Sequence, residues 1–152
     1  MKKYNTKGFT LIEVLLVIAI LAILAAVVII AINPAKQLGE ARDAQRRNDV
    51  RAIVDALQQY SIDNRGEYPD TIPWGGDDCL LDGMDICING IACDGSNLDV
   101  LAEEQKYLAD IPVDPSIEPE EVTGYWVLGT NSGRVSVCAP SVYGDDPIVI
   151  VQ

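Results

Sequence analysis

The sequence contains no histidine and little positive charge in its second part. Without histidine, catalysis by a Ser-His or Cys-His pair and metal ligation by imidazole are excluded. Residues 52–152 hold only 3 Lys and Arg against 19 Asp and Glu. Because proteins bind nucleic acid largely through Lys and Arg at the phosphates, no nucleic-acid partner is expected. No nucleophile stands beside a base and no glycine-rich phosphate loop is present, so we do not expect an enzyme.

Charge and hydrophobicity divide the 152-residue chain into two unlike parts. Residues 1–51 hold 8 basic and 4 acidic residues, a net charge of +4, whereas residues 52–152 have a net charge of −16. The apolar residues concentrate in 9–32, where 22 of 24 are hydrophobic. At 49% hydrophobic overall, the chain is too apolar to be mainly disordered. We therefore expect an apolar, basic-flanked front and an acidic part that faces water.

The apolar run is long enough to cross a membrane. Val14–Ile32 is a run of 19 apolar residues. As a helix, residues 9–32 would be about 36 Å long, which exceeds the bilayer core of roughly 30 Å. The lysines in front of it favour a cytoplasmic N-terminus. A cleaved secretory signal is disfavoured by the length of the run and the missing small-x-small site. An uncleaved anchor is the simpler alternative, but it leaves Glu13 unexplained, since a carboxylate there costs about 2–3 kcal/mol or more.

The segment Gly8-Phe9-Thr10-Leu11-Ile12-Glu13 resembles the class III signal of bacterial type IV prepilins and pseudopilins. The resemblance implies that prepilin peptidase cuts between Gly8 and Phe9 on the cytoplasmic side. It also implies N-methylation of the new N-terminus at Phe9. The chain would then consist of a leader peptide (1–8), a transmembrane and filament-core helix (9–35) and a globular head (36–152).

The resemblance also implies a role for Glu13 in assembly. In the family, the glutamate at this position pairs with the N-terminal amine of the neighbouring subunit and fixes the axial register. An unpaired buried charge is costly, and an opposite charge can offset that cost. The alternative is that Glu13 only stabilises the N-terminus of its own helix, where the helix dipole favours negative charge.

A second helix is predicted after the apolar run. Asn33-Pro34 should interrupt the first helix, and residues 35–64 should form the second, ending at Asn64-Arg65-Gly66. One apolar face recurs at three- and four-residue intervals: Val50, Ile53, Val54, Leu57 and Tyr60. Acidic residues interleave with a basic cluster, which we interpret as a solvated face: Arg42, Arg46, Arg47 and Arg51. Binding of lipid head groups or phosphate is an alternative, and the resemblance also implies that the cluster could meet acidic patches of adjacent subunits in a filament.

The remaining sequence predicts a small α+β head. Residues 70–97 are loop-like, and 98–109 form a short helix candidate capped by Ser96 or Asn97. Three strands are expected at Tyr125–Leu128, Arg134–Ala139 and Ile148–Val151, the first two joined by a turn at 131–133. The predicted fold is pilin-like: a long N-terminal helix, half membrane-spanning and half amphipathic, packed on a small antiparallel sheet.

Four cysteines and several aspartates lie in the head. An even number of cysteines in an exported segment favours disulfides, and among three connectivities we prefer Cys79–Cys87 with Cys93–Cys138. The spacings lack the close pairs typical of zinc sites. The aspartates could supply oxygen ligands for calcium, although acidic loops are more often only solvated; the candidates are Asp77, Asp78, Asp82 and Asp85. No other cofactor is expected.

These features and the resemblance together predict a structural protein, the subunit of a type IV pilus filament. The expected partners are other pilin subunits, prepilin peptidase, an inner-membrane assembly platform and, before assembly, the lipid bilayer. The prepilin would sit in the inner membrane as a single-pass protein and later enter an extracellular filament. A pseudopilin of type II secretion is the main alternative, and a membrane-tethered periplasmic domain is a remote one.

Overall fold

The computed structural model describes residues 8–118, 120–144 and 146–152. The leader predicted at 1–8 therefore lies, except for Gly8, outside the described residues. The chain divides into two compact units, one reaching Leu38 and the other covering Gly39–Gln152. The second unit holds the sheet and the core, and we call it the head.

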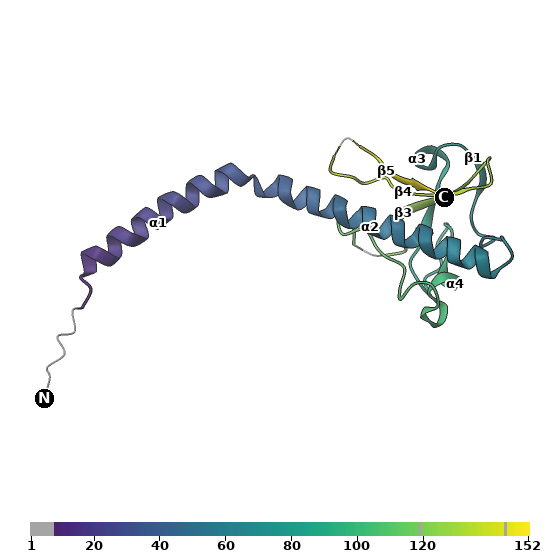
Figure 1. Ribbon diagram of the computed structural model, residues 1–152, viewed down its shortest axis with the longest axis horizontal. Coiled ribbons are helices and arrows are strands. Elements are labelled where there is room, and N and C mark those ends of the chain that lie inside the picture. The colour runs from purple at the N-terminus through teal and green to yellow at the C-terminus, as the bar shows by residue number, and fades with distance from the viewer. Residues whose placement is uncertain (1–7, 119, 145) are drawn as a thin grey trace, which may run out of the picture. The chain divides into compact units, whose positions relative to one another are not determined.

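The first helix, α1, covers Leu11–Ile32 and is drawn in purple in Figure 1. Thr10 is its N-cap: the Thr10 hydroxyl accepts a hydrogen bond from the Glu13 amide at 3.3 Å. The helix ends at Asn33, whose φ of 42° places it in the left-handed region. None of its residues is buried. The predicted long apolar helix and its interruption at Asn33-Pro34 are confirmed.

The second helix, α2, covers Pro34–Asp63. Proline suits the first helical position because no intrahelical partner for its missing N–H is needed there. The predicted apolar face is confirmed: Val50, Ile53, Val54 and Leu57 are buried and Tyr60 is partly buried. The chain leaves the helix through two residues of positive φ, Arg65 at 61° and Gly66 at 93°. The Gly66 amide donates to the Ser61 carbonyl at 2.7 Å, which closes the C-terminus near the predicted residue.

The strands are β1 (Trp74–Gly76), β2 (Met84–Cys87), β3 (Val122–Thr130), β4 (Val135–Ala139) and β5 (Ile148–Val151). β3 pairs antiparallel with β2 and β4, β4 pairs antiparallel with β5, and β1 lies parallel to β3. The three predicted strands are confirmed, but the sheet is mixed rather than wholly antiparallel. β1 is three residues long and includes two glycines, so it has no alternating pattern that would reveal it.

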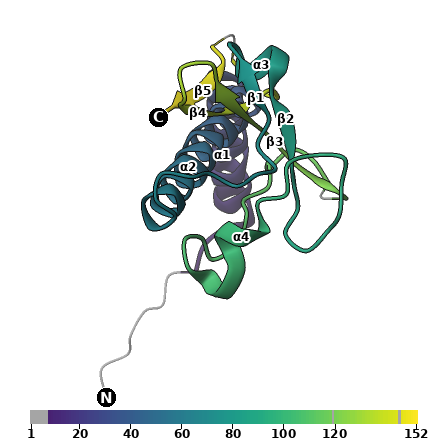
Figure 2. The ribbon, with the colours of Figure 1, turned by 90° about the vertical axis from the view of Figure 1, so that its right-hand side faces the viewer.

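Two further predictions about the head are wrong in part. The segment expected to be a loop contains β1, β2 and the short helix α3, Cys79–Asp82. The helix expected over 98–109 is only α4, Asp99–Ala102, followed by the 3₁₀ turn η1, Glu103–Gln105. Glu104 and Gln105 have φ of 53° and 56°, which stops the α-helix. Figures 1 and 2 show α3 and α4 at opposite sides of the head.

The core of the head lies between the apolar face of α2 and one face of the sheet. Tyr125, Val127 and Val137 contribute from the sheet, and the segment around α4 adds Leu98 and Leu101. A smaller apolar cluster forms around Cys79, Leu128 and Cys138. The head therefore buries apolar residues on both faces of β3 and β4.

Candidate functional site

The N-terminal motif lies in an exposed segment that leads into α1. Gly8 and Phe9 precede the helix in extended or irregular conformation, and Phe9 is 81% exposed. Apart from Gly8 and its chain neighbours, none of the described residues places an atom within 4 Å of the position that a Cβ on Gly8 would occupy. The fold described here therefore has no steric need for glycine at this position, and the Gly8–Phe9 peptide bond is open to solvent.

Glu13 lies in the first turn of α1 and is exposed. Its amide is taken up by the Thr10 cap, while the helix dipole favours the negative charge of its side chain at this end. It is also the only ionisable residue in the sequence between Gly8 and Pro34. The arrangement fits the dipole interpretation within one chain and leaves the carboxylate accessible to a positive group from another.

The apolar side chains of α1 have no partners within the described chain. Those from Phe9 to Ile32 that are large and hydrophobic are between 49% and 82% exposed. The helix is long and apolar enough to cross a membrane, with a mean hydropathy of 3.5. A helix that is apolar all round requires an apolar surrounding, either lipid or other helices.

All four cysteines form disulfides, but the predicted connectivity is wrong. The bonds are Cys79–Cys138 and Cys87–Cys93. Cys79 opens α3 and meets Cys138 of β4 in the small cluster with Leu128. Cys87 ends β2 and closes a short loop with Cys93. Cys79 begins α3 and Cys87 ends β2, so these two cysteines lie on different elements and each bonds to another cysteine. Because the sequence does not reveal α3 and β2, it does not predict this connectivity.

The candidate calcium ligands hold the loops of the head together. The Asp82 carboxylate accepts from the amides of Asp77 at 3.2 Å and Asp78 at 3.4 Å. Asp78 caps α3, and Asp85 accepts from the Trp126 indole at 2.7 Å. Within the described residues, no group of three or more Asp, Glu, Cys or His side chains is arranged to hold a metal ion.

Arg46 departs from the predicted solvated face. It is 3% exposed, and its guanidinium donates to Asp114 at 2.6 and 3.0 Å, to Asp43 at 2.6 Å and to Ser116 at 2.6 Å. A signal was present in the sequence: Arg46 precedes Val50 by four residues and therefore lies on the apolar face of α2. Asp114 carried no such signal, because it lies in a proline-flanked loop far along the chain.

The buried network shifts the pKa values of its members. The hydrogen bond with Asp114 raises the pKa of Arg46 despite burial. Burial alone would raise the pKa of Asp114, but hydrogen bonds from Arg46 and Ser116 outweigh it and lower the pKa. The pKa of Asp43 is lowered in the same way against burial, by the amides of Tyr143 and Gly144 and by Arg46. All three groups are therefore held in their charged forms.

Asp43 also attaches the loop before β5 to α2. Its carboxylate accepts from the amides of Tyr143 and Gly144 at 3.0–3.1 Å. The Tyr143 ring lies over Gly39, where a Cβ would overlap it. Nearby, burial and a hydrogen bond to Asp49 at 2.7 Å raise the pKa of Tyr125. The polar contacts of α2 thus hold two loops and one strand of the head.

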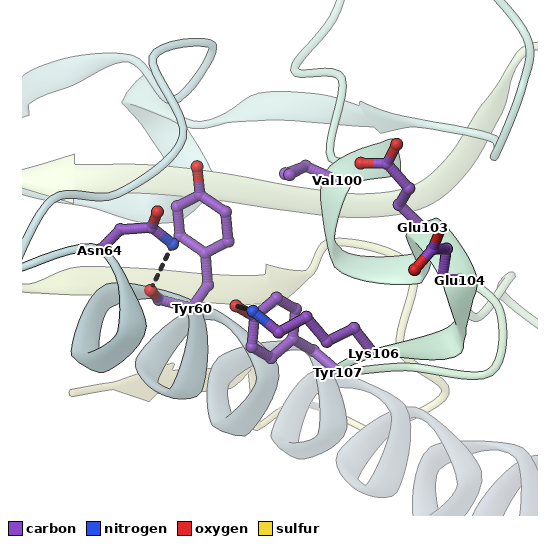
Figure 3. A pocket seen from close by; sticks show the side chains of 7 residues that line it. All are labelled: Tyr60, Asn64, Val100, Glu103, Glu104, Lys106 and Tyr107. Carbon is purple, nitrogen blue, oxygen red and sulfur yellow. Dashed lines mark hydrogen bonds between the residues drawn. The ribbon is translucent and has the colours of Figure 1, made fainter.

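A pocket of about 360 Å³ lies beside the C-terminal part of α2 (Figure 3). Tyr60 and Tyr107 meet edge to face there, with ring centroids 5.8 Å apart. The Lys106 ammonium lies 4.6 Å from the centroid of the Tyr107 ring and 2.9 Å from Asp63. Hydrogen bonds to the Tyr107 hydroxyl and Asp63 raise the pKa of Lys106, and Lys106 lowers that of Asp63. The head therefore already contains a cation held between an aromatic ring and a carboxylate.

Two comparisons with known proteins agree on the N-terminal region. Residues 3–31 match the family model described as the prokaryotic N-terminal methylation motif. The chain is 38% identical over 71 residues to the type II secretion system core protein G of Pseudomonas aeruginosa. That match covers 47% of this chain and about half of the relative's length, 48%. No solved structure matches.

The matched motif covers the exposed Gly8–Phe9 bond, the Thr10 cap, Glu13 and nearly all of α1, and this helix precedes a small α+β head. The observations from sequence, structure and comparison therefore point the same way: the chain carries the prokaryotic N-terminal methylation motif ahead of an α+β head, and over about half its length it is similar to a type II secretion core protein.

Proposed function

We propose that the chain is a structural subunit of a filament of the type IV pilus kind, in which many copies of α1 pack together. The observation that supports this most strongly is that no residue of α1 is buried. Twenty-two residues, almost all apolar, lie outside the core of the head. A filament interior built from such helices replaces lipid contacts with helix contacts at little cost in apolar exposure. The role is structural, and no catalysis is proposed.

The proposed maturation begins in the inner membrane. The basic leader stays in the cytoplasm, α1 spans the bilayer and the head faces the periplasm. Prepilin peptidase cuts between Gly8 and Phe9, and the new amine of Phe9 is methylated. Because the fold leaves Gly8 without steric neighbours, the requirement for glycine is assigned to the peptidase.

The proposed assembly step uses Glu13. Cleavage creates a positive amine at Phe9, and the exposed carboxylate of Glu13 in a neighbouring copy neutralises it as both leave the lipid. The pair sets the axial register because a one-turn slip would leave both charges unpaired in an apolar surrounding. An assembly platform in the inner membrane then extracts the subunit into the growing filament, which extends outside the cell.

A pseudopilus of type II secretion is the second candidate, and one observation favours it. The relative described above is named a type II secretion core protein, although the match covers about half of each chain. In that case the same subunit forms a short filament that drives secretion. The two candidates share α1, Glu13 and the maturation step, and differ in filament length and cargo.

The proposal is tested with Glu13→Gln, which removes the charge and keeps the shape of the side chain. We expect normal membrane insertion and cleavage but a strong loss of filaments, seen by electron microscopy of sheared fibres. Glu120→Gln, which removes an exposed charge from the head, is the matched control and should assemble normally. Normal filament yield from Glu13→Gln would contradict the proposed register contact.

Mass spectrometry of the sheared fibres tests the maturation step and the two candidates together. We expect subunits that begin at methylated Phe9. Long surface fibres containing this chain, with secretion intact in a strain that lacks it, identify a pilus subunit. Loss of protein secretion without surface fibres identifies a pseudopilin. A chain that keeps residues 1–8 and occurs only as a dispersed membrane protein would contradict both candidates.

A further inference from the structure

A second pocket of about 460 Å³ lies where α2 ends and the β3–β4 turn begins. Two aromatic and two acidic side chains line it together with two glycines: Gly66, Glu67, Tyr68, Asp70, Trp74 and Gly133. Glu67 and Asp70 are exposed, and neither forms an ion pair within the described parts of the chain. We call this site the Tyr68–Trp74 pocket.

Trp74 is fixed in place although it is 49% exposed. Its indole lies over Gly129 of β3, where any Cβ would overlap the ring. The Gly129 amide donates to the Pro73 carbonyl at 2.7 Å, and Tyr68 packs against the indole with centroids 5.9 Å apart. The three-residue strand β1 thus presents a rigid aromatic surface to solvent, beside two carboxylates.

The same chain shows what such a combination holds. In the pocket of Figure 3, Lys106 lies over the Tyr107 ring and pairs with Asp63. A ring face attracts a cation through its quadrupole, and tryptophan does so best. The Tyr68–Trp74 pocket offers a tryptophan, a tyrosine and two carboxylates, but no Lys or Arg is among the described residues that line it. Its chemistry therefore fits a basic side chain from outside the chain.

Few basic residues of the head are available for such a contact. Arg46 is buried and Lys106 is paired with Asp63. Arg65 and Arg134 directly neighbour lining residues of the pocket itself, Gly66 and Gly133, and so lie at the same end of the head. The exposed arginines that remain lie earlier on α2: Arg42, Arg47 and Arg51.

Arg47 and Arg51 are one helical turn apart and exposed on the same side of α2. Within the described residues neither forms an ion pair. They precede the end of α2 at Asp63 by about 24 and 18 Å along the helix axis, at 1.5 Å per residue. The distance is too great for them to fill the pocket of their own chain, so the two surfaces meet only between copies.

We propose that the Tyr68–Trp74 pocket of one subunit takes Arg47 or Arg51 of a second copy of this chain. The inference rests on the proposed function, in which the copies of a filament share one orientation and are offset from one another along its axis. A contact between two different surfaces gives a ring if the rotation between copies closes and a filament if it does not, and an offset along the axis gives the filament. Charge complementarity supports the second copy as the occupant, since the acidic pocket and the exposed arginines occur on the same chain.

Cysteine cross-linking of the full chain in cells that assemble it tests the contact. Arg51→Cys combined with Asp70→Cys should give a ladder of covalent multimers after mild oxidation. The matched control combines Arg51→Cys with Glu103→Cys, which places the second thiol at the pocket of Figure 3. Neither the control nor any single cysteine variant should give covalent multimers.

Charge reversal provides a second measurement. Arg47→Glu with Arg51→Glu should lower filament yield about tenfold or more, because like charges then face each other. Adding Glu67→Arg and Asp70→Arg should restore the yield. Trp74→Ala should also reduce assembly, while the fluorescence of Trp126 reports that the head is folded.

The outcomes separate this contact from the proposed function. If the parent chain forms filaments but neither Arg47→Cys nor Arg51→Cys gives a ladder with Asp70→Cys, or if only the control gives one, this contact is overturned while the proposed function stands. Reduced assembly by Trp74→Ala but not by the arginine reversals overturns it too, since another occupant then fills the pocket. Failure of the parent chain to form any filament overturns the proposed function and this contact with it.

Discussion

The two long helices place their apolar side chains in opposite environments: those of α1 are exposed, and those on the apolar face of α2 pack in the core of the head. α1 has no buried residue among its 22, whereas α2 buries nine of its 30, including the stripe from Val50 to Leu57. The amphipathic α2 needs its own head to complete a core, and α1 needs an apolar partner from outside. Stability of the head and the proposed packing of α1 in a filament therefore depend on different residues, which allows each to be changed separately.

The largest effect on the stability of the head is expected from Arg46→Met. Loss of the cation leaves the carboxylates of Asp43 and Asp114 buried and unpaired, which should lower the free energy of unfolding by about 3–5 kcal/mol. Urea unfolding of the full chain in non-ionic detergent, followed by the fluorescence of Trp74 and Trp126, measures it. The exposed Arg47→Met is the control and should change the value by less than about 0.5 kcal/mol.

The two disulfides should differ in their contributions to head stability. Replacing Cys79 and Cys138 by serine opens a loop of 59 residues and should cost about 4 kcal/mol, because a long loop gains the most entropy on unfolding. Replacing Cys87 and Cys93 opens a separation of 6 residues and should cost about 2 kcal/mol. The same urea titration compares them, and equal losses would contradict the loop-length argument.

Leucine truncations compare the two helices directly. Leu57→Ala on α2 should lower the free energy of unfolding by about 3 kcal/mol, since it leaves a cavity in the core. Leu24→Ala on α1, where the leucine is 56% exposed, should leave head unfolding unchanged. A similar loss from both variants would show that α1 contributes to the core of the head.

The smallest expected effect is on how the free energy of unfolding depends on pH, through titration of the buried carboxylates of Asp43 and Asp114. The pKa values of Asp43 and Asp114 are lowered on folding, so their contribution is complete above about pH 4 to 5 and is lost as the pH falls through the folded values. The free energy of unfolding between pH 6 and pH 2 should therefore fall less steeply for Asp43→Asn than for the parent. Asp55→Asn, at an exposed position, should retain the steep fall.

Local patterns predicted much of this fold. Nineteen consecutive apolar residues, the Asn33-Pro34 break and the spacing of Val50, Ile53, Val54 and Leu57 were sufficient for both helices. Strand-forming runs separated by a turn were sufficient for β3, β4 and β5. Each of these signals lies within a few residues of the structure that it predicts.

The errors concern contacts between residues far apart in the sequence. Cys79 pairs with Cys138 because α3 and the β3–β4 hairpin bring them together, and neither the order nor the spacing of the cysteines states this. Arg46 is buried because Asp114 reaches it from a loop 68 residues away. β1 exists through its pairing with β3, where Gly129 makes room for Trp74. The candidate site at Gly8, Phe9 and Glu13 is local by contrast, and it lies within the residues that the methylation-motif model matches.

The bond between Cys79 and Cys138 has a mechanical consequence. It turns the 59-residue separation into a covalent ring, so tension applied to the two ends of the chain crosses the sulfur atoms and bypasses everything between them. Fully stretched, that bypassed part would add roughly 200 Å at about 3.4 Å per residue. β2, α4 and β3 lie within the ring, while α2, β1 and β5 lie outside it. Under tension, β1 and β5 at the ends of the sheet can therefore detach while the segment between Cys79 and Cys138 does not lengthen.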